Sequence, residues 1–226
     1  MRHYLLTLIF LVATFARAFA LSDDFVKVDL SGATASQNHL SARADIKPGN
    51  AIDGAKSGAM AGWNNGELKK SDGTEADSNT LDSGANTWTL DLGMARPLDA
   101  ITIYFEGAYG TAFDIEFFNE NPDEAVAPAE TVKVTANTTT AFELPFDKTM
   151  EYRYIRLNFL GATNHDWGIK FYEVEFFRNL GNVEGATAQV TANNTGSSTI
   201  VKGEASTLSL AIFDADGNPV GTLSNF

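Results

Sequence analysis

Apolar and polar residues alternate with a period of two through most of the chain from residue 87 onward. The alternation is clearest where Trp88, Leu90 and Leu92 are interleaved with Thr89 and Asp91. Because successive side chains of a strand point to opposite faces, the pattern predicts antiparallel strands with one buried face. The same alternation occurs at residues 101–105, 113–117, 132–134, 142–144, 155–159 and 171–177, between clusters of Gly, Asn, Asp and Pro. Helical periodicity is nearly absent, so we predict an all-β sandwich.

The strand at residues 171–177 carries carboxylates within an aromatic pattern. A strict period of two places Phe171, Glu173 and Glu175 on one face, opposite Tyr172, Val174 and Phe176. Glu173 is then expected to share a face with an aromatic side chain. A carboxylate in such surroundings needs a partner, because burying an unpaired charge is costly.

Residues 33–86 differ from the rest in composition. They are rich in Gly, Ser, Ala, Asn and Asp and contain few strand-like runs, so they are expected to form long loops, which often carry function. Residues 62–84 read as an inserted polar loop that contains Trp63.

The first twenty residues have the features of a secretory signal peptide. Arg2 precedes an apolar run at residues 5–15, and Ala18 and Ala20 fit a cleavage site. The run is shorter than the roughly 20 residues that a membrane span requires. We therefore expect a secreted or cell-surface protein, with residues 21–32 leading into the first domain.

Charge and cysteine content exclude several classes of function. Without Arg2 and Arg17, 14 of the 16 basic residues remain against 29 acidic ones, a formal net charge of −15. Such a surface disfavours nucleic acid and anionic membrane lipid as partners. The chain has no cysteine, which removes thiol nucleophiles and cysteine-bound metals. Stability must therefore come from packing, with or without a metal.

Several motifs together resemble a discoidin domain, the F5/8 type C group of galactose-binding-like modules that includes family 32 carbohydrate-binding modules. They are residues 50–54 with Trp63 downstream, 88–93, 101–103, 152–157 and 173–176, which occur in the family's order over residues 33–178. The resemblance implies a discoidin-type jelly-roll β-sandwich with ligand loops at one end. It also implies that Trp63 and Trp88 belong to the core.

The tail predicts a second unit. Residues 179–186 read as a linker, and residues 187–226 contain strand patterns that resemble the start of a bacterial immunoglobulin-like domain. Three strands are too few to close such a sandwich, which needs about seven. We therefore expect a partial, truncated domain and a longer modular chain.

The resemblance also implies a structural calcium ion. Its ligands would be the side chains of Asp53 and Glu173, carbonyl oxygens near Ala51 and Ala55, and the hydroxyl of Ser57, since Ca²⁺ takes six to eight hard oxygen ligands. The alternative is that Asp53 caps its own turn while Glu173 faces solvent or pairs with Arg156. The family's Thr before the Trp is absent here, and Trp63 lies farther from Asp53 than is usual.

A candidate ligand site is the loop at residues 164–167. Sugars stack their C–H face on an aromatic ring while polar groups bind the hydroxyls, so Trp167 beside Asn164, His165 and Asp166 suits a glycan. Alternatively, Trp167 folds inward over the edge of the sandwich and His165 is only an exposed loop residue. Further candidates are Tyr109, whose flanking glycines could equally mark a tight hairpin, and the loop residues Asn64 and Glu67.

No catalytic motif is present. The chain lacks Gly-x-Ser-x-Gly, His-Glu-x-x-His and a phosphate loop, and only His39 and His165 lie beyond the leader. A carboxylate pair that hydrolyses glycosides depends on a separation that sequence does not reveal. We therefore predict a secreted, non-catalytic module that binds a glycan or glycoprotein, with a galactose-type sugar as the first candidate. The alternative is a protein-binding cell-adhesion or spacer domain of a larger surface protein.

Overall fold

The computed structural model describes residues 21–22, 24–76, 81–122, 126–182, 187–193, 207–213 and 219–224. The predicted leader, residues 1–20, lies outside these ranges. Within them the regular structure is strand, apart from the 3-10 helices η1 (Pro48–Ile52) and η2 (Leu180–Asn182). No helix in the described ranges is long and apolar enough to cross a membrane.

Eight strands build the main body, and every pairing between them is antiparallel. They are β1 (Phe25–Lys27), β2 (Thr34–Gln37), β3 (Ala61–Asn64), β4 (Leu81–Phe105), β5 (Gly110–Phe118), β6 (Glu130–Val134), β7 (Ala141–Thr163) and β8 (Gly168–Asn179). Their order is β1-β8-β4-β7-β5-β6, with β2 added on β4 and β3 on β8. The predicted all-β sandwich is confirmed.

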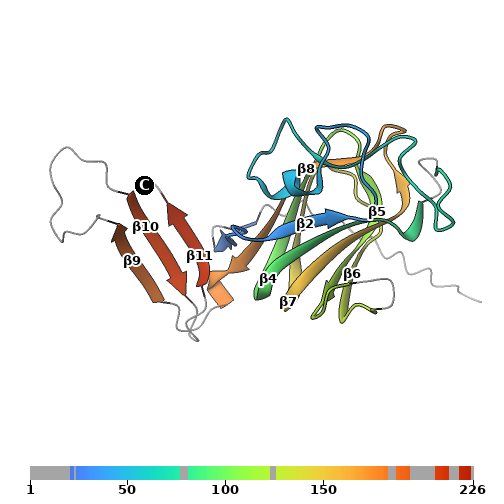
Figure 1. Cartoon of the computed structure of the whole chain (residues 1–226). Helices are drawn as coiled ribbons and strands as arrows, with labels where there is room; N and C mark the ends of the chain where they lie inside the picture. The colour runs from blue at the N-terminus through green and yellow to red at the C-terminus, as the bar shows by residue number, and fades with distance from the viewer. Residues whose placement is uncertain are drawn as a thin grey trace, which may run out of the picture.

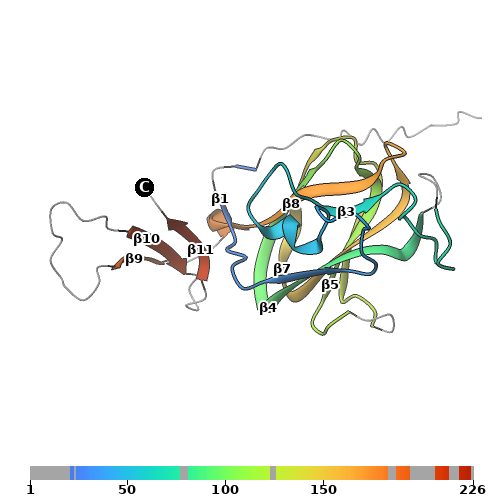
Figure 2. The same ribbon diagram turned by 45° about the horizontal axis from the view of Figure 1, so that its top comes forward.

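The long strands β4 and β7 belong to both layers of the sandwich. They pair from Leu81 opposite Gly161 to Tyr104 opposite Ala141, with three register shifts at which the ladder bends. The first part of β4 pairs with β2 and its last part with β8, while the last part of β7 pairs with β5. Figure 1 shows the resulting twisted ribbons, and Figure 2 shows η1 lying beside β8.

The core fills the space between the layers and is strongly aromatic. Trp88, Leu90 and Leu92 are buried, whereas Phe142 and Leu144 at the start of β7 are only partly buried. The other predicted inward residues of β5 and β7 are fully buried: Phe113, Ile115, Phe117, Ile155, Leu157 and Phe159. Trp63 and Trp88 are both fully buried, as expected. Their indole N–H groups donate to the carbonyls of His39 (2.9 Å) and Pro48 (3.0 Å), so neither buried donor is left unpaired.

The expectation that Glu173 shares a face with Phe171 is wrong. The register between β4 and β8 shifts at this point: Tyr104 lies opposite Glu173, whereas Phe105 lies opposite Phe171. This irregularity changes the phase of the alternation. As a result, Phe171 lies in the core together with Val174 and Phe176, and the two glutamates lie on the outer face of β8.

The prediction that residues 62–84 form one polar loop is also wrong at both ends. Trp63 lies in β3, which pairs with β8 from Ala61 to Asn64, and β4 already begins at Leu81. The period-two pattern did not predict β3, because Gly62 has no side chain with which to continue the alternation. A Cβ at Gly62 would lie 2.2 Å from the carbonyl oxygen of Ile169, so only glycine permits this close pairing.

Three strands of the tail are described: β9 (Thr187–Asn193), β10 (Thr207–Phe213) and β11 (Pro219–Ser224). They form an antiparallel sheet in the order β11-β10-β9. The predicted strands are therefore present, while the immunoglobulin-like character of the tail stays a prediction. Half of the predicted linker, residues 183–186, and the segments joining these strands lie outside the described residues, whereas residues 179–182 form the end of β8 and η2.

Candidate functional site

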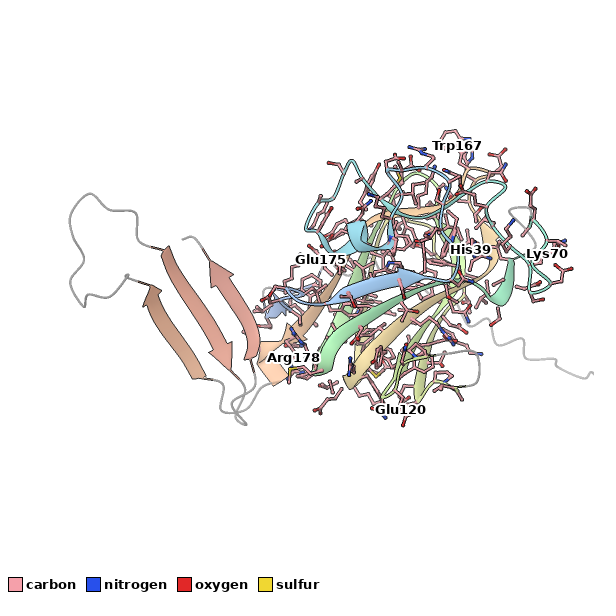
Figure 3. The ribbon with its side chains drawn as sticks, in the orientation of Figure 1. His39, Lys70, Glu120, Trp167, Glu175 and Arg178 are labelled. Carbon is pink, nitrogen blue, oxygen red and sulfur yellow. The ribbon has the colours of Figure 1, made fainter. Side chains whose placement is uncertain are left out.

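The loop between β7 and β8 presents an aromatic side chain to solvent. Trp167 is 55% exposed, and the His165 ring lies against it with a centroid distance of 3.9 Å and a tilt of 40°. His165 Nδ1 is 2.6 Å from Asp166 Oδ1, close enough for an ion pair when the imidazole is protonated but not aligned as a hydrogen bond. Trp167 therefore points outward, and Figure 3 shows it at the end of the sandwich.

Glycine at position 168 makes this outward turn possible. Gly168 has φ of 106°, and a Cβ there would lie 2.1 Å from the carbonyl oxygen of Trp63. The backbone of β8 thus begins in tight contact with β3, and Asn65 N donates to the carbonyl of Trp167 (3.1 Å). The loop is consequently held to β3 and the loop after it by main-chain contacts.

Asn164 ties this loop to the one between β4 and β5. Its Oδ1 accepts from Tyr109 N (2.6 Å), its Nδ2 donates to the carbonyl of Gly107 (2.8 Å), and its own N donates to the carbonyl of Tyr109 (3.0 Å). Tyr109 is half-buried, with its ring 6.2 Å from that of Phe105. Asn164 is thus part of the Trp167 loop and Tyr109 lies beside it, and these contacts give both residues a role in shaping the loops.

Glu67 ties together two further loops. Its carboxylate accepts from Ala42 N (2.7 Å) and Asn64 N (2.8 Å). Burial opposes ionisation, but hydrogen bonds from Ser41, Asn64 and Ala42 outweigh it and lower the pKa of Glu67. Asn64 itself pairs through its main chain with Gly168 at the foot of the Trp167 loop. The predicted residues Asn64 and Glu67 therefore reach the same end of the sandwich as Trp167.

One neighbour of this site was missed by the sequence analysis. Leu40 is 71% exposed in the loop after β2, which Glu67 and the indole of Trp63 hold against the other loops. A lone apolar residue in a polar loop is a weak signal, because single exposed hydrophobic residues are common.

The second predicted site brings the Asp53 loop and β8 together, as expected. Glu173 is 1% exposed, and its Oε2 accepts from Gly54 N (3.1 Å). Asp53 Oδ1 accepts from Ala55 N (2.8 Å), so Asp53 caps its own turn. Arg156 pairs with Glu116 (2.6 Å) and not with Glu173, which excludes that alternative partner.

Two lysines neutralise the carboxylates on the outer face of β8. Lys27 Nζ is 2.8 Å from Glu175 and 3.5 Å from Glu173, and Lys56 Nζ is 3.0 Å from Glu175 and 2.8 Å from the hydroxyl of Tyr104. Burial raises the pKa of Glu173. For Glu175, burial is outweighed by hydrogen bonds from Lys27 and Lys56, so its pKa is lowered. We call these four charged residues the lysine–glutamate cluster.

The residues around this cluster do not fit a calcium site. The hollow beside it, of about 430 Å³, is lined by three carboxylates, and each already accepts a main-chain N–H: Asp29 from Ser31, Asp53 from Ala55 and Glu173 from Gly54. The described residues contain no group of three or more His, Cys, Asp or Glu side chains that could hold a metal. Of the other predicted ligands, Ala51 is fully buried in η1, and Ser57 is exposed. We therefore do not expect the calcium ion that the resemblance implies, and the unfolding experiment in the Discussion tests this.

A family model for the F5/8 type C domain matches residues 32–173. The chain belongs to the F5/8 type C domain family. The match begins after β1, ends within β8 and leaves out the tail strands. No curated protein matches the chain.

Solved structures share the fold of this F5/8 type C domain. Chitosan-binding module 1 of a chitosanase/glucanase from Paenibacillus sp. IK-5 has 15% identity and a TM-score of 0.50, over 67% of this chain and 99% of its own. The family 32 carbohydrate-binding module of C. perfringens NanJ, solved with galactose, has 18% identity and a TM-score of 0.45, over 68% and 99%. A fucolectin from striped bass (Morone saxatilis) serum has 16% identity and a TM-score of 0.49, over 83% and 68%. The chain thus shares the β-sandwich fold of the chitosan-binding module.

Proposed function

We propose that this F5/8 type C domain is a non-catalytic carbohydrate-binding module, which is exported and holds a sugar of a glycan or glycoprotein on Trp167. The observation that carries the proposal is the 55% exposure of Trp167 beside His165 and Asp166, on a loop hydrogen-bonded to the loops after β3 and β4. An exposed indole offers its face to the C–H side of a sugar ring, and adjacent polar groups can bind hydroxyls.

The arrangement also supports binding without catalysis. The indole lies on an open surface at the end of the sandwich, and Asn164 and Glu67 have their polar atoms engaged in holding loops. A rigid platform of this kind reduces the entropy that binding costs. Family membership and the shared fold of sugar-binding modules agree with this function, and a galactose-type sugar is the first candidate.

A glycan array, followed by titration of the best sugar, tests the proposal. Trp167→Ala is expected to weaken binding about five- to thirtyfold, because stacking on one aromatic face is worth on the order of 1–2 kcal/mol. Met94→Ala is the matched control, since Met94 is 59% exposed and lies in β4 away from the loops. A flat array, or equal affinity of Trp167→Ala and wild type, would contradict the proposal.

Export is tested separately. Residues 1–20 are expected to be removed during secretion, so the amino-terminal sequence of the secreted protein should begin at or near residue 21. Retention of residues 1–20 on the secreted protein would refute the predicted leader.

A further inference from the structure

A second hollow lies on the side of the sandwich. Its volume is about 510 Å³, within the range of roughly 300–1,000 Å³ typical of small-molecule sites. Its lining comes from the loops after β2 and β3, the start of β4, and Arg156 of β7. Figure 3 shows two of its residues, His39 and Lys70, below the end of the sandwich that carries Trp167. We call it the side hollow.

The side hollow is basic although the protein is acidic. Among the described residues that line it, Lys69, Lys70 and Arg156 are basic and none is Asp or Glu, whereas the whole chain has a formal net charge of −13. Within the described part of the chain, neither lysine forms an ion pair. An anion entering the hollow would therefore meet two ammonium groups that are not already neutralised.

Arg156 is held in a fixed orientation at this hollow. Its Nε donates to Glu116 (2.6 Å), and its guanidinium lies 4.7 Å from the centre of the Phe118 ring. Among the described residues, its two terminal nitrogens donate no hydrogen bond. A guanidinium fixed in this way presents a planar pair of donors, which is the geometry that binds carboxylate or sulfate oxygens.

Polar groups of the rim are also held in place. Asn38 accepts from Thr87 N (3.1 Å) and donates to the carbonyl of Ala85, and Ser71 donates to Asp82 (3.1 Å), which itself does not line the hollow. Burial, aided by the nearby Lys69, lowers the pKa of His39. Its imidazole is therefore neutral at pH 7 and adds hydrogen-bonding capacity without charge. The basic side chains suit the acid group of a ligand, and the neutral polar groups suit hydroxyls on the ring that carries it.

We propose that the side hollow is a second binding site, which takes the anionic group of an acidic saccharide, a uronate carboxylate or a sulfate ester. The proposal rests on the glycan-binding function proposed above but uses a different surface from Trp167. The acidic remainder of the protein repels polyanions at long range, so binding depends on the local charge of the hollow.

The test titrates the full chain with three oligosaccharides of matched length: an oligogalacturonate, a sulfated neutral oligosaccharide, and its unsulfated form. At low salt, at least one acidic ligand is expected to bind, and the double variant Lys69→Gln/Lys70→Gln is expected to weaken it about tenfold, from two exposed charge contacts. Raising the salt to about 150 mM should weaken binding further. Comparing the oligogalacturonate with the sulfated oligosaccharide shows whether the side hollow binds a carboxylate or a sulfate ester.

Two controls make the result specific. Lys47→Gln/Lys133→Gln changes the net charge equally at exposed lysines outside the hollow and should leave acidic-ligand affinity unchanged. Lys69→Arg/Lys70→Arg keeps the charge and should retain binding. Equal weakening by both glutamine double variants would overturn the proposal, as would failure of both acidic ligands to bind.

Failure of this inference is distinguishable from failure of the proposed function. Trp167→Ala should weaken neutral sugar binding while acidic-ligand binding at the side hollow persists. If Trp167→Ala abolishes acidic-ligand binding and Lys69→Gln/Lys70→Gln does not, the second site is refuted while the sugar site at Trp167 stands.

Discussion

Replacing Lys27 with methionine removes the one ammonium group that contacts both Glu173 and Glu175. These carboxylates are 1% and 4% exposed, so they keep little solvation of their own. Glu175 retains Lys56, but Glu173 retains only the N–H of Gly54. Methionine preserves the length and apolar stem of lysine, so the variant isolates the loss of charge.

The size of the effect follows from the exposure of the partners. Breaking a fully buried ion pair costs roughly 3–5 kcal/mol, but the Lys27 side chain is 43% exposed and solvent screens part of the attraction. We therefore expect the free energy of unfolding to fall by about 2 kcal/mol at pH 7, a drop in Tm of about 4–8 °C for a domain of this size.

The loss should depend on pH, and its sign follows from the two carboxylates. The raised pKa of Glu173 contributes stability that is present below its unfolded-state pKa and is lost as the pH rises through the folded-state value. The lowered pKa of Glu175 contributes stability that is present above its unfolded-state pKa and is lost as the pH falls through the folded-state value. Removing Lys27 should thus be most harmful when both are ionised and less harmful at lower pH, once Glu173, whose pKa is raised, has taken up a proton.

Thermal and chemical unfolding of wild type and Lys27→Met at about pH 7.5 and about pH 4.5 measures both effects. Lys47→Met is the matched control, because Lys47 is exposed and outside the cluster. The reasoning is refuted if Lys27→Met is as stable as wild type at the higher pH, or if its loss of stability is the same at both.

The remaining predictions concern metal dependence, backbone geometry and a buried ion pair. Millimolar calcium or a chelator is expected to leave the Tm of wild type unchanged, because Lys27 and Lys56 already neutralise the carboxylates on the outer face of β8. A calcium-dependent rise in Tm would show instead that the family's metal site is functional. Gly168→Ala should cost at least about 3 kcal/mol by thermal unfolding, because its Cβ meets a carbonyl oxygen at 2.1 Å, whereas Gly66→Ala, with φ of 80° and open space, should cost only about 1 kcal/mol. Arg178→Met should cost about 3–5 kcal/mol by chemical denaturation, since it leaves the buried Asp99 without its charged partner at 2.6 Å; a loss below about 1 kcal/mol would contradict this.

The alternation of apolar and polar residues and the order of the family's motifs were sufficient to predict the fold. Most of the predicted inward residues of β4, β5 and β7, such as Trp88, Phe113 and Leu157, are fully buried, because a period of two leaves a strand one consistent apolar face. The period failed at β8, where a register shift changes the phase between Phe171 and Glu173. It also failed at β3, where close backbone contact at Gly62 takes the place of side-chain alternation.

The sequence by itself determined the all-β class, the family, and the loop in which an aromatic residue stands beside polar ones. It could not determine which way Trp167 faces, because that depends on the contact of Gly168 with β3, 105 residues away along the chain from Trp63. Nor could it pair Lys27 and Lys56 with Glu173 and Glu175, or gather Lys69, Lys70 and Arg156 around one hollow. Those groupings join segments distant in sequence. Only tertiary packing, which sets the distances on which charge interactions depend, decided them.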